Sequence, residues 1–213
     1  RGEQMTQILV ERARSAYPTT ILTIYENLDR VEIRNELDAE KMPFVGGNGN
    51  WHDSYYFAFP LNLSKDNLKV MRGGQKWFDR LPDDYLPGAR TDGVTTQHLF
   101  GMTDGNSSAM IAHRQAFHWV YPSYVDTKLK PKDAPKSFPA MFTGKFPLPE
   151  ATVYSRAVRR SNQSDTHDLG VINMQTVEPD LKENYVFDYA IAADGKFDEV
   201  KAWTLGANFN LPL

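Results

Sequence analysis

The sequence predicts an all-β fold, an antiparallel sandwich or closed sheet with little helix, and three observations support this. Short runs of β-branched and aromatic residues alternate with Gly, Pro, Asn and Asp turns along the chain. Only residues 5–16 have a helix-like pattern, and they are equally compatible with a strand through Ile8, Leu9 and Val10. The length of 213 residues lies within the range of one large β-sandwich, so we expect a single domain.

The first predicted unit is a hairpin. Residues 20–26 are β-branched and apolar on both faces, as in a central strand of a two-layer packing. Residues 27–30 supply a turn, and apolar and charged side chains alternate in residues 31–37. We therefore expect two adjacent strands with one face toward water.

The middle of the chain contains a second predicted hairpin. A strand at 55–61, ended by Pro60, precedes loops and short strands over 63–92. Residues 94–102 and 108–114 then flank Asp104-Gly105, a preferred turn dipeptide. A loop of two or four residues would place His98 and His113 on the same face, directly or diagonally opposed.

The remaining elements are predicted from the same signals. Residues 116–121 alternate in polarity, and 122–149 contain six of the 13 prolines, which favours a long surface excursion that could lie across a neighbouring domain. A turn is expected at Asp194-Gly195. Further strands are expected at 152–158, 170–174, 185–192 and 200–205.

Composition excludes several partners. The net charge of -3 and the pI near 6.0 give no field suited to nucleic acid or to an anionic membrane, and no apolar run reaches the roughly 20 residues that span a bilayer. The chain begins with Arg1, which indicates a processed form or a piece of a longer protein. Zero cysteines leave the compartment open, and a periplasmic or secreted bacterial location is compatible with the sequence.

Catalytic and metal signatures are missing from the sequence. It has no His-x-His or His-Glu-x-x-His motif, and His113 and His118 are five residues apart, which places them on opposite faces of an unbroken strand. The 27 acidic residues offer no way to select the carboxyl pair that glycoside hydrolysis requires. We therefore expect no catalytic residue, metal or other cofactor in this chain.

With catalytic and metal signatures missing, the function that the sequence still indicates is sugar binding at a surface. Residues 51–121 hold four of the five histidines and three of the four tryptophans. Aromatic faces suit the apolar C–H faces of a pyranose, and forked donors and acceptors suit its hydroxyls, although half or more of these aromatics could instead be core. The candidate carbohydrate-binding residues are Trp51, His52, Tyr55, Tyr56, Trp77, Arg90, His98, Arg114, His118 and Trp119.

The order of these strands resembles a known family. Residues 24–38 and 54–61 are similar to successive strands of the large C-terminal β domain of glycoside hydrolase family 38 α-mannosidases. Residues 86–90, 95–101 and 107–113 resemble the next strands, and 168–170 with 185–189 resemble the closing part. The resemblance covers most of the chain, and it rests on loose strand patterns without catalytic signatures.

The resemblance implies a large antiparallel β-supersandwich of the galactose-mutarotase-like type, a piece of a multidomain glycoside hydrolase. In that family the β domain follows a β/α barrel that carries the catalytic aspartate and the zinc, and it can contribute to the sugar pocket. This chain shows no counterpart of the barrel, so we expect it to be inactive alone. Its expected partners are that barrel and a glycan, with zinc only on the barrel.

Two alternatives remain open from the sequence. The chain could be a stand-alone carbohydrate-binding module that binds glycan through its aromatic residues. It could also be an aldose epimerase, in which His98 or His118 would face Glu150 or Glu178 across the sugar ring.

Overall fold

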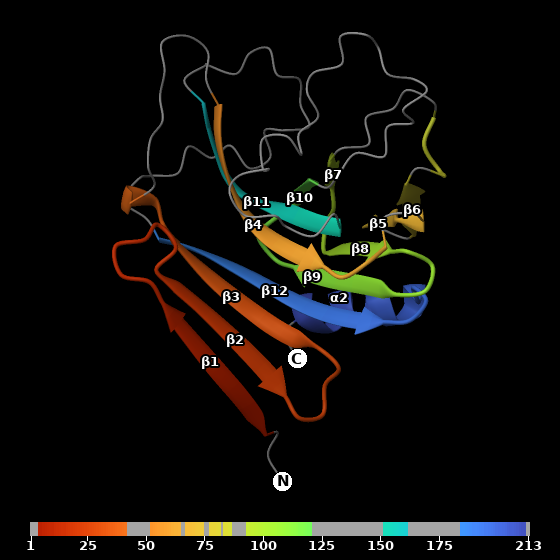
Figure 1. The fold of residues 1–213 in the computed structure, drawn as a ribbon, viewed down its shortest axis with the longest axis horizontal. Helices are drawn as coiled ribbons and strands as arrows, with labels where there is room; N and C mark the ends of the chain where they lie inside the picture. Colours follow the sequence, from red (N-terminus) through yellow and green to blue (C-terminus); the bar gives the residue numbers. More distant parts are fainter. Residues whose placement is uncertain are drawn as a thin grey trace.

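Two antiparallel sheets stack face to face in the computed structural model, which describes residues 4–41, 52–64, 67–74, 77–81, 83–86, 93–120, 151–161 and 184–211 (Figure 1). Sheet A has the order β1-β2-β3-β12-β9-β8-β5-β6, and sheet B has the order β4-β11-β10-β7. The elements are β1 (Met5–Glu11), β2 (Thr19–Tyr25), β3 (Val31–Asp38), the 3-10 turn η1 (Ala39–Lys41), β4 (His52–Leu61), β5 (Lys69–Gly73), β6 (Phe78–Leu81), β7 (Gly93–Thr95), β8 (Leu99–Thr103), β9 (Ser108–His113), β10 (His118–Val120), β11 (Ala151–Ser161), β12 (Asn184–Asp194) and α2 (Glu199–Asn210).

The main core lies between the two sheets. Phe59 and Trp119 from sheet B meet Phe100 and Tyr189 from sheet A, and all four side chains are buried. The buried Tyr189 hydroxyl lies 3.0 Å from Ser155 Oγ, which satisfies its polar end. The predicted all-β sandwich with little helix is therefore confirmed.

The predicted N-terminal hairpin is confirmed as β2 and β3, with β1 paired to the outer side of β2. The helix-like stretch at residues 5–16 therefore contains a strand. In β3 the apolar side chains share one face and the charged ones share the other, because Ile33 lies opposite the core residue Tyr189 and Arg34 lies opposite Asp188. Arg34 donates to Asp188 across this pair at 2.8 Å.

Proline is tolerated inside β4 because of that strand's position. The predicted strand at 55–61 forms the second part of β4, which pairs with β11 at one edge of sheet B. Pro60 lies opposite Thr152 and does not end the pairing at once. An edge strand accommodates a residue without an N–H because only one side of its backbone must bond to a neighbour.

The second predicted hairpin is confirmed, but its first strand is shorter than expected. Residues 99–103 pair with β9 through the four-residue loop 104–107, whereas β7 belongs to sheet B. The chain crosses between the sheets at 96–98. The Asp104 carboxylate accepts backbone N–H groups from Ser64, Asn106 and Ser107, which lowers its pKa.

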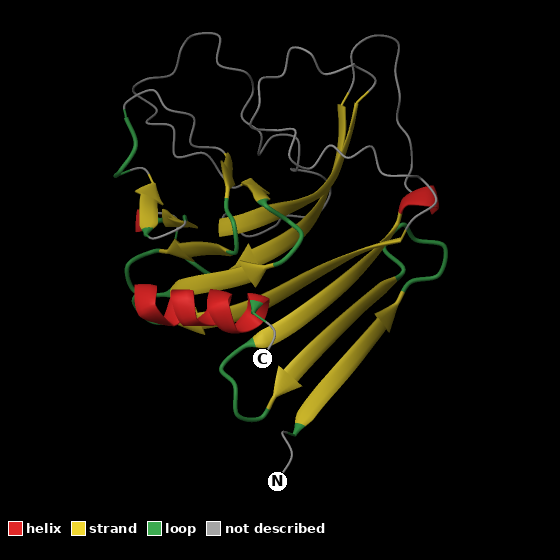
Figure 2. Cartoon of the chain, turned by 180° about the vertical axis from the view of Figure 1, so that it is seen from behind, coloured by secondary structure: helices red, strands yellow, loops and turns green. Residues whose placement is uncertain are grey.

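The predicted strand at 200–205 is wrong, because this segment lies in helix α2. Asp198 caps the helix by accepting the N–H groups of Val200 and Lys201 at 2.8 and 3.1 Å. The buried face is Ala202, Leu205, Gly206 and Phe209, a helical spacing. This face packs on the outer side of sheet A, against β9, β8 and β12, in a second core (Figure 2).

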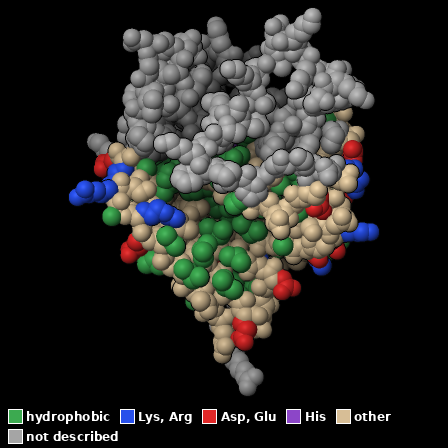
Figure 3. Space-filling model, viewed as in Figure 1, with side chains coloured by type: hydrophobic (Ala, Val, Ile, Leu, Met, Phe, Trp, Pro, Cys, Tyr) green, Lys and Arg blue, Asp and Glu red, His purple; other side chains and the backbone are tan. Residues whose placement is uncertain are grey.

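One half of sheet A extends beyond the other layers. Strands β1 to β3 fan out past sheet B and α2 (Figures 1 and 2). On the face that continues the sandwich interior, Ile8, Leu22 and Ile33 form one row with the core residue Tyr189. Ile8 and Ile24 on this face are 45% and 42% exposed. Hydrophobic side chains gather on this side of the molecule in Figure 3.

Several expectations fall outside the described residues. These are the proline-rich excursion at 122–149 and the strand at 170–174. Among the described helices, none has the length and apolar character required to cross a bilayer.

Candidate functional site

An exposed aromatic side chain is held by charged residues at the β5–β6 end of sheet A. Arg72 on β5 lies directly opposite Asp79 on β6, and the two form an ion pair between Nη2 and Oδ2. The Trp77 indole, 64% exposed, donates from Nε1 to the other Asp79 oxygen, Oδ1, at 3.1 Å. Asp79 therefore fixes both the guanidinium and the indole.

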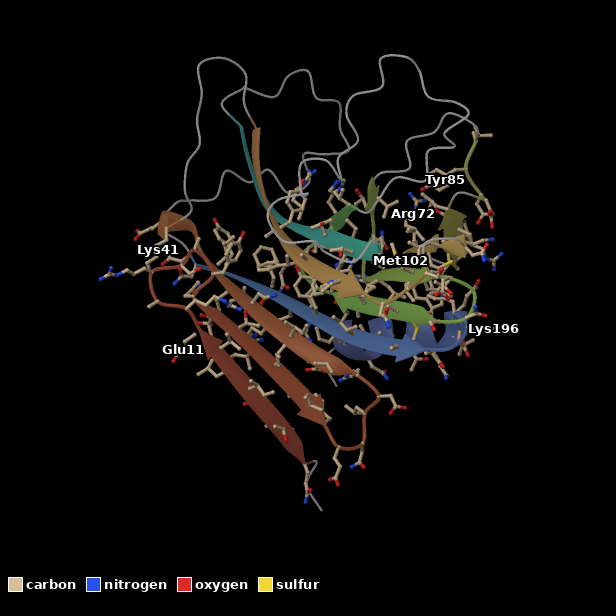
Figure 4. All side chains as sticks on the ribbon, viewed as in Figure 1. Glu11, Lys41, Arg72, Tyr85, Met102 and Lys196 are labelled. Atoms are coloured by element: carbon tan, nitrogen blue, oxygen red, sulfur yellow. The ribbon has the colours of Figure 1, made fainter. Side chains whose placement is uncertain are left out.

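Tyr85 extends this cluster on the side of Arg72. The Arg72 guanidinium carbon lies 5.8 Å from the centre of the Tyr85 ring, a cation–π geometry. Figure 4 shows these two labelled side chains together at this end of the sheet. Partial burial raises the pKa of Tyr85, and the positive charge of Arg72 partly opposes that shift. We call Arg72, Trp77, Asp79 and Tyr85 the Trp77 cluster.

The other two described cations of the same hairpin are also paired. Lys69 lies 2.5 Å from Asp83, and Arg80 lies 2.7 Å from Glu199 at the start of α2. The Glu199 carboxylate raises the pKa of Arg80. Among the described residues, the cluster is thus surrounded by compensated charge and has no strong net field.

Tyr56 lies in a second aromatic group on the outer face of sheet B. Its ring packs edge-on against Tyr154 at 6.4 Å, and the Arg156 guanidinium carbon lies 5.7 Å from its centre. Arg156 is 7% exposed, and its Nε atom has no hydrogen-bond partner. Tyr56 itself is half-buried.

Trp119 belongs to the core and offers no surface to a ligand, which corrects its place among the candidate contacts. It is completely buried, and its ring stacks on Phe100 with centroids 4.8 Å apart and an interplanar angle of 14°. His118, its neighbour on β10, is half-buried and lies against Gly93. Among the described contacts, none joins Trp119 or His118 to the Trp77 cluster.

The pair His98 and His113 has the expected register but two different environments. The four-residue loop sets them opposite each other, and the His113 N–H bonds to the His98 carbonyl at 3.0 Å. His98 is exposed, whereas His113 is completely buried, and burial lowers its pKa to about 3. One face of the sheet therefore does not present two accessible imidazoles.

Arg114 makes contacts within the fold. Its Nε and Nη2 atoms donate to the Phe209 carbonyl at 3.1 and 2.5 Å, and its guanidinium carbon lies 4.5 Å from the centre of the Phe209 ring. A cation at the last turn of α2 complements the free carbonyls of the helix end. The residue thus ties α2 to sheet A.

The other candidates are not placed in detail. Trp51 and Arg90 lie outside the described residues, and so do Glu150 and Glu178. His52 and Tyr55 lie on β4 by their backbones, without described side chains. In the described part of the chain, no three His, Asp or Glu side chains group so as to hold a metal ion.

Sequence reasoning selected Trp77 but missed the three residues around it. A signal was present in the sequence, because Trp77 and Asp79 are two residues apart, the spacing that places strand residues on one face, and Arg72 precedes Gly73-Gly74, a dipeptide that suits a turn. Because loops and short strands were expected over residues 63–92, the pairing of β5 with β6 was not predicted.

The comparisons with known proteins concern the fold. No protein-family model matches the sequence, and no curated protein matches it. The similar solved structures include an α-mannosidase from Enterococcus faecalis V583 with a TM-score of 0.52 and a glycosyl hydrolase family 38 protein from Enterococcus faecalis with a TM-score of 0.51. Each is 13% identical, and each match covers 87% of this chain and 17% of the other.

This likeness confirms part of the expected resemblance. The fold of the chain corresponds to a part of proteins in the family 38 α-mannosidase group, and the chain spans 17% of their length. At 13% identity the likeness is one of fold alone. The assignment to the C-terminal domain stays a prediction.

Proposed function

We propose that this chain is a non-catalytic, carbohydrate-facing β domain of a family 38-like glycoside hydrolase, which supports or completes the sugar site of a catalytic barrel. The observation that carries the proposal is the match of 87% of this chain to only 17% of an α-mannosidase. A fold that occurs as a small part of a large glycosidase suits a supporting role. We assign the zinc of such enzymes to the barrel.

The uncovered half of sheet A supports a partner of this kind. The N–H of Arg12 and the carbonyl of Gln4 both bond toward β2, so the odd-numbered residues of β1 direct their backbone groups away from the sheet. Met5 and Leu9 on β1 are 57% and 56% exposed, and the strand has no proline, lysine or bulge. Free apolar edges of this kind are normally covered in native proteins.

We propose that the adjoining part of the parent hydrolase covers this face and edge. The apolar row Ile8, Leu22 and Ile33 continues the sandwich core without a break, so a domain that packs there extends an existing interior. The occupant needs an apolar surface for the face and an extended segment for the edge.

Deletion from the parent enzyme tests the supporting role. Hydrolysis of an aryl α-mannoside is measured for the parent protein, for the parent without these 213 residues, and for the chain alone with added Zn²⁺. We expect activity only in the complete parent. Hydrolysis by the isolated chain that a single acid-to-amide substitution abolishes would overturn the proposal, and so would a parent that has no barrel.

A matched pair of substitutions tests the docking face. Ile24→Lys places a charge on the uncovered face, and Val200→Lys changes a 74% exposed residue on α2. In the isolated chain we expect Ile24→Lys to reduce self-association, and in the parent we expect it to lower thermal stability and activity. Val200→Lys should leave all three properties unchanged. A parent that tolerates both substitutions equally would place the partner elsewhere.

A stand-alone carbohydrate-binding module is the second candidate, and the exposed Trp77 ring favours it. The two functions separate cleanly in the deletion experiment. A binding module that acts on its own adds nothing to catalysis, so an enzyme that carries this chain should keep its turnover of a small aryl mannoside without it and lose only its affinity for large glycans.

A further inference from the structure

We propose that the Trp77 cluster is a subsite for a neutral pyranose, which stacks on Trp77 and bonds through its hydroxyls to Asp79 and Arg72. The inference rests on the proposed function in taking a carbohydrate as the ligand. It adds the residues that bind, the role of each, and the charge class of the sugar.

A hydrogen bond to Asp79 holds the Trp77 ring in one orientation, so that a sugar can stack on its exposed face. An indole that is 64% exposed would normally rotate freely, but its Nε1–H bonds to Asp79 Oδ1 at 3.1 Å. Asp79 is in turn held by Arg72 from the neighbouring strand. A ring fixed before binding loses little conformational entropy when a sugar stacks on it. Its exposed apolar face matches the C–H face of a pyranose.

The same two charged residues retain capacity for hydroxyl groups. Each carboxylate oxygen of Asp79 can accept two hydrogen bonds, and the described contacts use one on each oxygen. Arg72 has five N–H donors in a fixed fork, and Nη2 serves the ion pair. Neighbouring sugar hydroxyls, which both donate and accept, can therefore bridge Asp79 and Arg72. The Tyr85 ring, whose centre lies 5.8 Å from the guanidinium carbon, supports Arg72.

Local charge selects a neutral sugar. Arg72 is neutralised by Asp79, Lys69 by Asp83 and Arg80 by Glu199. Asp84, whose carboxylate accepts the Arg80 N–H, adds a further negative charge. Among the described residues of this hairpin, each of the three cations is already paired with a carboxylate, so the carboxylate of an acidic sugar would meet no unpaired cation, whereas a neutral hexose requires none.

The test follows the indole N–H signals of the intact 213-residue chain by NMR. Four tryptophans give four signals, and the one lost in Trp77→Phe identifies Trp77. Methyl α-mannopyranoside and α-linked mannobiose serve as neutral probes, with sodium glucuronate as the anionic probe. We expect the neutral probes to shift the Trp77 signal, with a Kd on the order of 1 mM for a single subsite.

Variants separate a binding role from a folding role. Trp77→Ala should weaken binding at least about tenfold, whereas Trp77→Phe should retain part of it because a flat ring remains. Asp79→Asn should weaken binding and shift the Trp77 signal of the free protein. Leu211→Ala, at a residue with 65% exposure just after α2, is the control and should bind as the native chain does.

Three results would overturn the subsite. They are a Trp77 signal that stays unmoved up to the solubility limit of the neutral probes, tighter binding of glucuronate than of the mannosides, and native affinity in Trp77→Ala. Each is independent of the deletion experiment, which measures hydrolysis by the parent. A parent that needs this domain but shows no Trp77 response retains the supporting role and loses only this subsite.

Discussion

Thr96 Oγ1 and His113 Nε2 share a hydrogen bond of 2.6 Å in the interior of the molecule. Thr96 begins the crossing from β7 of sheet B to β8 of sheet A, and His113 ends β9 of sheet A. Both residues are buried, and the His113 ring packs on Trp119 at 5.4 Å. His113 Nδ1 has no hydrogen-bond partner. This contact joins the two sheets, and it requires a neutral imidazole because protonation would bury an unpaired charge.

Acid should therefore destabilise the fold through His113. Burial lowers its pKa from 6.5 to about 3, so between these values the unfolded chain binds the extra proton. The contribution of His113 to stability is complete above pH 6.5 and is lost as the pH falls toward 3. We expect a loss of about 1.4 kcal/mol between about pH 7.5 and 5.5, measured by urea unfolding.

The control for this prediction is the other histidine of the pair. His113→Gln should remove most of this pH dependence, whereas His98→Gln, at an exposed position, should retain it. Equal pH dependence in the two variants would show that His113 is not the titrating group.

Truncation of two tryptophans should affect stability to very different extents. Trp119→Ala removes a completely buried ring and should lower the free energy of unfolding by about 3–5 kcal/mol. Trp77→Ala removes an exposed ring and should change it by about 0.5 kcal/mol or less. Denaturant titration of both variants checks this, and a similar loss in each would contradict the assignment of Trp77 to a surface role.

Gly73 should not tolerate a side chain. A Cβ atom there would lie 2.9 Å from the Leu99 carbonyl oxygen, and a backbone atom within a sheet cannot move aside easily. Gly73→Ala should lower stability by about 1–3 kcal/mol. Gly195→Ala is the control because the nearest described atom would lie 3.7 Å away. Thermal unfolding of both variants decides the point, and equal melting temperatures would argue against the clash.

The N-cap of α2 should contribute measurably to stability. Asp198→Ala removes the acceptor of two backbone N–H groups, at an expected loss of about 0.5–2 kcal/mol. Asp198→Ser retains a capping oxygen and should recover most of that loss. The measurement is again the urea midpoint. A Ser variant as unstable as the Ala variant would mean that capping is not what Asp198 contributes.

Local signals predicted elements where the chain pairs with itself over a short distance. The alternation in residues 31–37 and the Asp104-Gly105 turn predicted β3 and the β8–β9 hairpin, because side-chain period and turn chemistry act within a few residues. The same logic could have found α2. Asp198 followed by Ala202, Leu205 and Phe209 at helical spacing is an N-terminal cap with an amphipathic face.

The candidate site was less predictable because exposure depends on distant neighbours. Trp77 and Trp119 both lie in β-type sequence, yet Phe59 and Tyr189, which are remote in sequence, bury Trp119. Arg114 is 43% exposed and donates to the Phe209 carbonyl of α2, a contact that no local sequence pattern indicates. Residue type indicates which side chains can bind a sugar, and it does not indicate which of them the fold leaves accessible.

The sequence by itself determined a β-rich chain with its hairpins, since strand period and turn residues encode these locally. Only the tertiary structure decided which strands share a sheet, that β7 and β8 belong to different layers, and that Arg72 and Asp79 pair beside Trp77. The physical reason is that burial and strand order arise from contacts between residues far apart in the chain, which no local pattern contains.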